Sequence, residues 1–117
     1  MTLVKTEAAA AISWLGLWFH NRQEFPDMTL AAPDTAVPLV ITLILAGLWA
    51  IRPGPVLRWL TLAWLGLNLL GAVVTVLPLG MLPFDPEQSW AHYSSHLVYA
   101  LAQLPWLWML IRHPRQD

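Results

Sequence analysis

The stretch SWAHYSSHLVYALAQLPWLWMLIR, residues 89–112, is long and apolar enough for a helix that crosses a lipid bilayer. Among its polar side chains, four follow one another at spacings of four, three and four residues: His92, His96, Tyr99 and Gln103. This spacing keeps all four on one helical face. The segment is therefore predicted to be a helix with one polar stripe, which must face protein rather than lipid tails.

The composition of the chain indicates that its solvent is a membrane rather than water. Apolar residues make up 57% of the 117 positions and charged residues 11%, against about 45–50% and about 25% in soluble domains. A body of this size, which we treat as one domain over residues 1–117, cannot bury such an excess inside itself. The net charge of −1 and the lack of basic runs argue against nucleic acid as a partner, and without cysteine there is no thiolate metal site.

Apolar runs separated by proline, glycine and charged residues predict four helices. A helix needs about 20 residues to cross about 30 Å of hydrocarbon, so the last two runs are long enough, the second is marginal and the first is short. We therefore expect an all-α fold, an integral membrane bundle of four transmembrane helices, with a helix lying in the membrane interface as the alternative for the first run. The predicted spans are residues 4–20, 36–52, 56–78 and 89–112, joined by outer loops 21–35 and 79–88 and by an inner turn 52–56.

Local signals mark where two of these helices begin. Asp34 or Thr35 can cap the second helix. The run DPEQ at residues 85–88 has the pattern of an N-cap, an N1 proline and an acidic first turn, so it predicts the start of the fourth helix. With that start, His92 would lie about two turns into the helix.

The basic residues predict how the helices are oriented. If the turn at 52–56 and the C-terminus face the cytoplasm, most basic residues lie inside and only Arg22 lies outside, as the positive-inside rule requires. The inner residues are Lys5, Arg52, Arg58, Arg112 and Arg115. We thus expect a multi-pass protein of the lipid bilayer with both termini cytoplasmic, and the leucine-, alanine- and tryptophan-rich composition suggests a bacterial plasma membrane.

The tryptophans divide between the two predicted interfaces, where this amphipathic ring is enriched. On the outer side we expect Trp14, Trp18 and Trp90, and on the inner side Trp49, Trp59, Trp106 and Trp108.

Small and polar residues recur along one face of every predicted helix. Lipid gives helices no hydrophobic reason to associate, so these faces are expected to meet inside the bundle. Asn68, near the middle of the third span, needs a hydrogen-bond partner because an unpaired amide in hydrocarbon is costly. Gln103 is the expected partner, and a structural role is the favoured interpretation of this pair.

His92 and His96 are separated by the i, i+4 spacing that brings two imidazoles within reach of one ion. His20 ends the polar face of the first helix on the same outer side, and Glu24 and Asp27 follow it, so further ligands could converge there. We therefore predict His20, His92 and His96 as candidate ligands of zinc or copper. The HExxH motif of zinc proteases is absent from the sequence.

Three other interpretations of these polar residues stay open. His20 with His92 or His96 could ligate opposite faces of a haem b iron. His96, Tyr99 and Gln103 could line a pocket for a quinone-like head group. The third interpretation is structural: hydrogen-bonded residues near the interface that bind nothing.

No catalytic signature is found, so an enzyme is not expected. The leading functional hypothesis is a small polytopic membrane protein that acts through helix–helix contacts, as a subunit of a larger membrane complex or as a homo-oligomer. The alternative is a metal- or haem-binding membrane protein with the histidines at its outer face. Binding or transport of a small, quinone-like molecule is the second alternative.

Overall fold

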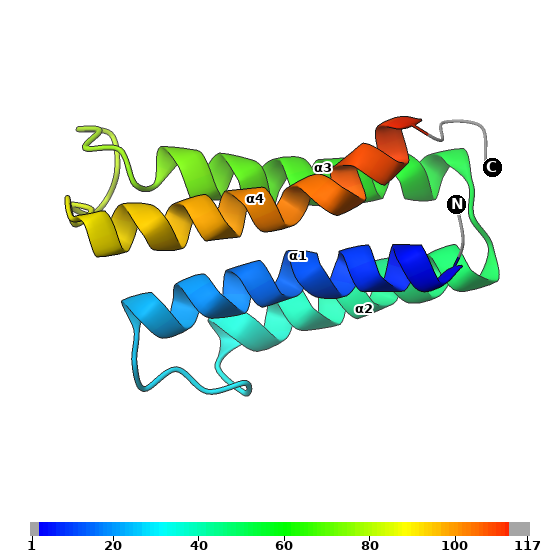
Figure 1. The fold of residues 1–117 in the computed structure, drawn as a ribbon, viewed down its shortest axis with the longest axis horizontal. Coiled ribbons are helices and arrows are strands. Elements are labelled where there is room, and N and C mark those ends of the chain that lie inside the picture. The colour runs from blue at the N-terminus through cyan, green and yellow to red at the C-terminus, as the bar shows by residue number, and fades with distance from the viewer. Residues whose placement is uncertain (1–2, 113–117) are drawn as a thin grey trace.

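The computed structural model describes residues 3–112, and within this range it contains four α-helices and no strand. The helices are α1 (Leu3–Glu24), α2 (Pro33–Ile51), α3 (Pro55–Val74) and α4 (Trp90–Arg112). They run up and down in turn within a body of 42 × 27 × 21 Å (Figure 1). The predicted all-α fold of four helices is confirmed. The predicted orientation also places Arg115 and both chain termini on the cytoplasmic side. These residues lie outside the described part of the chain.

Figure 1 shows which segments meet at each end of the bundle. The loops 25–32 and 75–89 lie at one end, called here the loop end. The turn 52–54 lies at the other, the turn end, beside the start of α1 and the end of α4. α1 packs chiefly against α4, the hairpin partners α1–α2 and α3–α4 supply most other contacts, and α2 touches α3 little.

α1 and α4 approach each other very closely at Gly16. A Cβ atom built at Gly16 would lie 2.3 Å from the Cβ of Ala102. Ordinary contact between carbon atoms is at about 3.5–4.0 Å, so only glycine fits here without moving a helix. Ala9 and Ser13 continue this face of α1, and both are buried. Small residues thus set the distance between the two helices that carry the histidines.

Two helices end at residues other than those predicted. α1 continues through Glu24 instead of ending near residue 20, which places Glu24 one turn beyond His20 on the same face. α3 ends at Val74 rather than at residue 78. Pro78 has no N–H to donate to the carbonyl of Val74, which instead accepts a turn hydrogen bond from Leu77 at 3.1 Å.

The start of α2 also differs from the prediction. Its N-cap is Ala32, in an extended conformation, and Pro33 occupies the first helical position. Asp34 lies in the first turn, so neither it nor Thr35 caps the helix. The hydroxyl of Thr35 is buried and accepts a hydrogen bond from the side chain of Asn21 at 3.1 Å, which ties the end of α1 to the start of α2.

α4 is capped by Ser89 and not by the DPEQ run. The Ser89 hydroxyl accepts a hydrogen bond from the backbone N–H of His92 at 3.2 Å. Residues 85–88 stay outside the helix, and the Gln88 amide donates to the carbonyl of Val76 at 2.9 Å. The prediction that His92 lies two turns into the helix is therefore wrong, because it lies in the first turn.

The interior is mainly apolar towards the turn end, where the buried Thr61 hydroxyl accepts a hydrogen bond from the Trp49 indole at 3.1 Å. One cluster of buried side chains fills that half: Ala9, Ala10, Leu45, Ala46, Trp49, Leu57, Leu65, Trp106 and Leu110. Leu65 and Trp106 are 0% exposed. Trp49 and Trp106 thus face the core of the bundle, whereas Trp59 and Trp108 are exposed.

Two of the described helices, α2 and α3, are long and apolar enough to cross a membrane. In each, 28% of the most apolar window is buried, so most of its apolar side chains point out of the bundle. From the sequence, the third and fourth apolar runs were instead predicted to be long enough to cross the membrane. α4 is longer, with 23 residues, but its polar stripe makes it less apolar.

Candidate metal centre

Three histidines and one glutamate meet at the loop end between α1 and α4. His20 and Glu24 come from the last turns of α1, and His92 and His96 come from the first turns of α4. The ring centroid of His96 lies 4.4 Å from that of His20 and 4.5 Å from that of His92. The structure therefore brings the three predicted ligand candidates together. Asp27 does not join the group.

The hydrogen bonds of Asn21 establish which nitrogen of His20 carries hydrogen. The amide nitrogen of Asn21 donates to the carbonyl of Asp34 at 3.0 Å and to the hydroxyl of Thr35 at 3.1 Å. The Oδ1 atom of Asn21 is therefore the atom that faces His20, and it only accepts. The Nδ1 of His20, 3.1 Å away, must be the donor. In the neutral ring, Nε2 then carries a lone pair.

His96 is held in the same way by α3. Its Nδ1 lies 2.7 Å from the carbonyl oxygen of Ala72, which can only accept, so Nδ1 carries hydrogen and Nε2 carries a lone pair. The Nε2 atoms of His20 and His96 are 3.0 Å apart. Two lone pairs on neutral rings would repel each other at this distance. A cation shared by the two nitrogens, either a proton or a metal ion, removes the repulsion.

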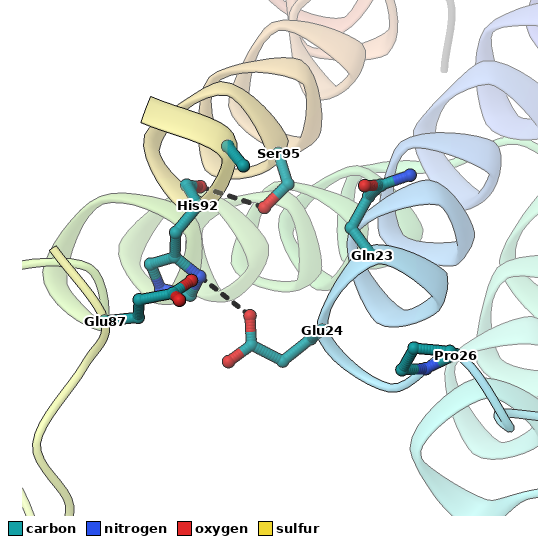
Figure 2. Close-up of a pocket in the computed structure, with 7 residues that line it drawn as sticks. Gln23, Glu24, Pro26, Glu87, His92 and Ser95 are labelled. Atoms are coloured by element: carbon teal, nitrogen blue, oxygen red, sulfur yellow. Dashed lines mark hydrogen bonds and ion pairs between the residues drawn. The ribbon is translucent and has the colours of Figure 1, made fainter. Parts of the chain in front are cut away.

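Glu24 connects this pair to the third histidine. The Nδ1 of His92 donates to a carboxylate oxygen of Glu24 at 2.8 Å, as Figure 2 shows. Ligand atoms of His20, Glu24 and His96 all lie within 4.8 Å of one another, and we call these three residues the His2Glu cluster. His92 is 6% exposed, and its Nε2 has no hydrogen-bond partner in the part of the chain that the structure describes.

The cluster borders an open recess of about 480 Å³, which we call the histidine recess. All three histidines and Glu24 line it, together with Asp85 and Glu87 from the loop before α4. A neighbouring recess of about 400 Å³ shares Glu24, Glu87 and His92 (Figure 2). The side chain of Glu24 is 32% exposed, so the cluster is in contact with the solvent at the loop end.

The His2Glu cluster fits a transition-metal ion. Zinc–nitrogen bonds of about 2.0–2.1 Å at a tetrahedral angle place two nitrogens about 3.3 Å apart. The observed separation of 3.0 Å between the Nε2 atoms of His20 and His96 is close to this distance. Each of these rings donates its Nδ1–H to an oxygen, which is how imidazole ligands of metals are usually oriented. Imidazole and carboxylate ligands suit zinc, and imidazole also suits copper.

The geometry does not fit haem b. Two axial nitrogens must lie about 4 Å apart, on opposite sides of a flat macrocycle. The Nε2 atoms of His20 and His96 are only 3.0 Å apart. The ring centroids of His20 and His92 are 6.5 Å apart. The ring centroid of His96 lies within 4.5 Å of each of them, so the His96 ring occupies the space that a macrocycle would need.

The other predicted polar residues use their hydrogen-bonding groups within the bundle. The Tyr99 hydroxyl donates to Oδ1 of Asn68 at 2.5 Å. The Ser13 hydroxyl donates to Gln103 Oε1 at 2.5 Å, and the Gln103 amide donates to the Ser13 carbonyl at 3.1 Å. The predicted pairing of Asn68 with Gln103 is therefore wrong. The polar ends of Tyr99 and Gln103 are therefore already paired within the bundle.

Sequence reasoning missed the two groups that orient the ligands. Asn21 follows His20 directly, and a polar residue at a helix end is a weak signal that could have identified it. The carbonyl of Ala72 has no sequence signal, since every residue carries one.

No protein-family model, curated protein or solved structure matches this chain. Its class is defined by its own geometry: an all-α protein of four helices with a cluster of histidine and glutamate at one end.

Proposed function

We propose that this chain is an integral membrane protein that binds a transition-metal ion of the zinc or copper type through His20, Glu24 and His96. One observation carries the proposal. The Nε2 atoms of His20 and His96 are 3.0 Å apart on rings whose Nδ1–H groups are already bonded to oxygen. A metal ion would accept both lone pairs at once, and the carboxylate of Glu24 would supply a third bond and a negative charge.

The outward faces of the helices support placement in a bilayer. Six large apolar side chains of α2 are between 45% and 81% exposed: Val37, Val40, Leu43, Ile44, Leu48 and Ile51. The same is true of Leu97, Leu101 and Leu104 on α4, which are between 44% and 59% exposed. In water such a belt would promote association, whereas lipid tails cover it without further contacts.

The ends of the bundle support an orientation with the turn end in the cytoplasm. Arg58 and Arg112 stack on the exposed rings of Trp59 and Trp108 at this end, as expected where helices leave a membrane. Most acidic residues lie at or next to the loop end, namely Glu24, Asp27, Asp34, Asp85 and Glu87, whereas Glu7 lies near the start of α1 at the turn end. We propose a multi-pass protein of a bacterial plasma membrane, with both termini on the cytoplasmic side.

The cysteine-free chain allows a direct test of this topology. In intact cells, a membrane-impermeant maleimide should label Met81→Cys, in the loop before α4, and should label Arg52→Cys only after lysis. Labelling of Arg52→Cys in intact cells would contradict the proposed orientation.

Metal binding is tested on detergent-purified protein titrated with Zn²⁺ or Cu²⁺. One ion per chain is expected. His20→Gln and His96→Gln should each weaken binding by more than about a hundredfold, since loss of outer partners alone costs about 10–100-fold. The matched control is His113→Gln, which makes the same change outside the described residues and should leave the affinity unchanged. Equal binding by all these variants would refute the proposed site.

Association with other subunits, or between copies of the chain, stays a separate prediction. All three residues of the His2Glu cluster come from one chain, so the proposed metal site does not depend on such contacts.

A further inference from the structure

We infer that the bound ion exchanges with the aqueous phase only at the loop end, through the histidine recess, and that the bundle does not pass it on to the turn end. This inference rests on the proposed function. It makes the protein a one-sided metal binder, such as a receptor or store, rather than a conduit through the membrane.

The open side of the cluster has the chemistry of a cation path. The histidine recess connects the His2Glu cluster to the loop surface and is rimmed by two exposed carboxylates, Asp85 and Glu87. Negative charge on the wall of a cleft concentrates cations and raises their rate of association. His92 also lines the recess, and its buried Nε2 has no hydrogen-bond partner among the described residues.

The opposite side of the cluster is closed by two layers. The first is polar but already paired, with Tyr99 bonded to Asn68 and a fully buried Gln103 bonded to Ser13. The second is mainly apolar. It contains Leu65, Trp106 and Leu110, which are 0%, 0% and 1% exposed, and the buried indole N–H of Trp106 can donate a hydrogen bond but cannot ligate a cation. An ion moving towards the turn end would break the paired layer and then lose all its ligands in an apolar core, which is very costly.

The first test measures the rate at which Cu²⁺ associates with detergent-purified protein in a stopped-flow instrument. Quenching of tryptophan fluorescence reports the binding. The variant Asp85→Asn with Glu87→Gln removes both charges at the rim. The matched control is Asp27→Asn with Asp34→Asn, which removes two charges from a different recess at the same end.

At low ionic strength the rim variant should bind Cu²⁺ about three- to tenfold more slowly than the wild type, and the control should stay within about twofold. The difference should disappear in about 0.5 M salt, where charges are screened within a few ångströms. If the control binds Cu²⁺ as slowly as the rim variant, or if the rim variant binds as fast as the wild type, the histidine recess is not the path by which the ion enters.

The second test uses metal-loaded protein in vesicles of phosphatidylethanolamine and phosphatidylglycerol, with the fraction in each orientation measured by labelling of Met81→Cys. EDTA on the loop side should remove the ion, and EDTA on the turn side should leave it bound. Removal from the turn side would refute the one-sided path. If the wild type binds no ion at all, the proposed function itself fails, so the two failures are distinguishable.

Discussion

Replacing Gly16 with alanine should destabilise the fold and widen the His2Glu cluster. The added Cβ would lie 2.3 Å from the Cβ of Ala102, and neither atom can move without its backbone. Restoring ordinary contact at about 3.5 Å requires α1 and α4 to separate locally by about 1 Å. Overpacking of this kind costs about 1–3 kcal/mol of unfolding free energy.

The same displacement reaches the cluster, because His20 lies one turn beyond Gly16 on α1 and His96 lies on α4. A shift of about 1 Å would lengthen the separation of their Nε2 atoms from 3.0 Å to about 4 Å, beyond the roughly 3.3 Å at which one zinc ion holds two nitrogens. The affinity for Zn²⁺ should therefore fall by about tenfold or more.

The assay compares unfolding in mixed micelles and Zn²⁺ affinity for four variants. Gly66→Ala is the matched control, because a Cβ at Gly66 meets nothing within 4 Å, and it should not weaken either property. Ala102→Gly added to Gly16→Ala should restore most of the lost stability and affinity, and Ala102→Gly alone measures its own cost. Normal stability and binding in Gly16→Ala, or failure of the second change to rescue it, would refute the reasoning.

Three further predictions concern the polar interior. Gln103→Leu should lower the unfolding free energy by about 1–2 kcal/mol because it leaves the Ser13 hydroxyl unpaired, and adding Ser13→Ala should recover part of the loss in the same micelle assay. Tyr99→Phe should cost about 0.6–2 kcal/mol by removing the donor to Asn68, and an unchanged unfolding midpoint would contradict this. Zn²⁺ affinity measured by competition should fall from pH 7.5 to 5.5 because protons compete for the imidazole lone pairs, and a pH-independent affinity would argue against imidazole ligands.

The inward faces of the helices could be predicted from the sequence because they depend only on geometry within one helix. The spacing of His92, His96, Tyr99 and Gln103 places them on one face, and all four are buried. The position of His20 at the same end follows from the alternating direction of successive helices.

Pairing between helices could not be predicted in the same way. The expected partner of Asn68 was Gln103, but the actual partner is Tyr99, one turn away on the same face. An axial shift of one turn, about 5.4 Å, exchanges one for the other. Close contacts such as that of Gly16 with Ala102 fix the axial position of one helix relative to the other. The pattern of residues along a single helix does not predict this position.

The His2Glu cluster was only partly predictable for a related reason. Glu24 was considered as a ligand, but its position depends on α1 continuing one turn past His20, where the predicted span had ended. The start of α4 was misplaced because a capping pattern competes with tertiary contacts. Gln88 bonds to the carbonyl of Val76 in the preceding loop, and Ser89 caps the helix instead.

The polar stripe of α4 can exist in an apolar helix because two neighbouring helices, α1 and α3, supply its hydrogen-bond partners. His92 bonds to Glu24 of α1, His96 to Ala72 of α3, Tyr99 to Asn68 of α3 and Gln103 to Ser13 of α1. α4 therefore lies between α1 and α3, and the cluster forms where these three helices meet. α2 supplies none of these bonds and reaches the cluster only through the contacts of Thr35 and Asp34 with Asn21, which orients His20. Its exposed apolar face is thus free of any role in forming the cluster, which is why the proposed contribution of α2 to membrane placement and the proposed contribution of α4 to metal binding can be tested by separate substitutions.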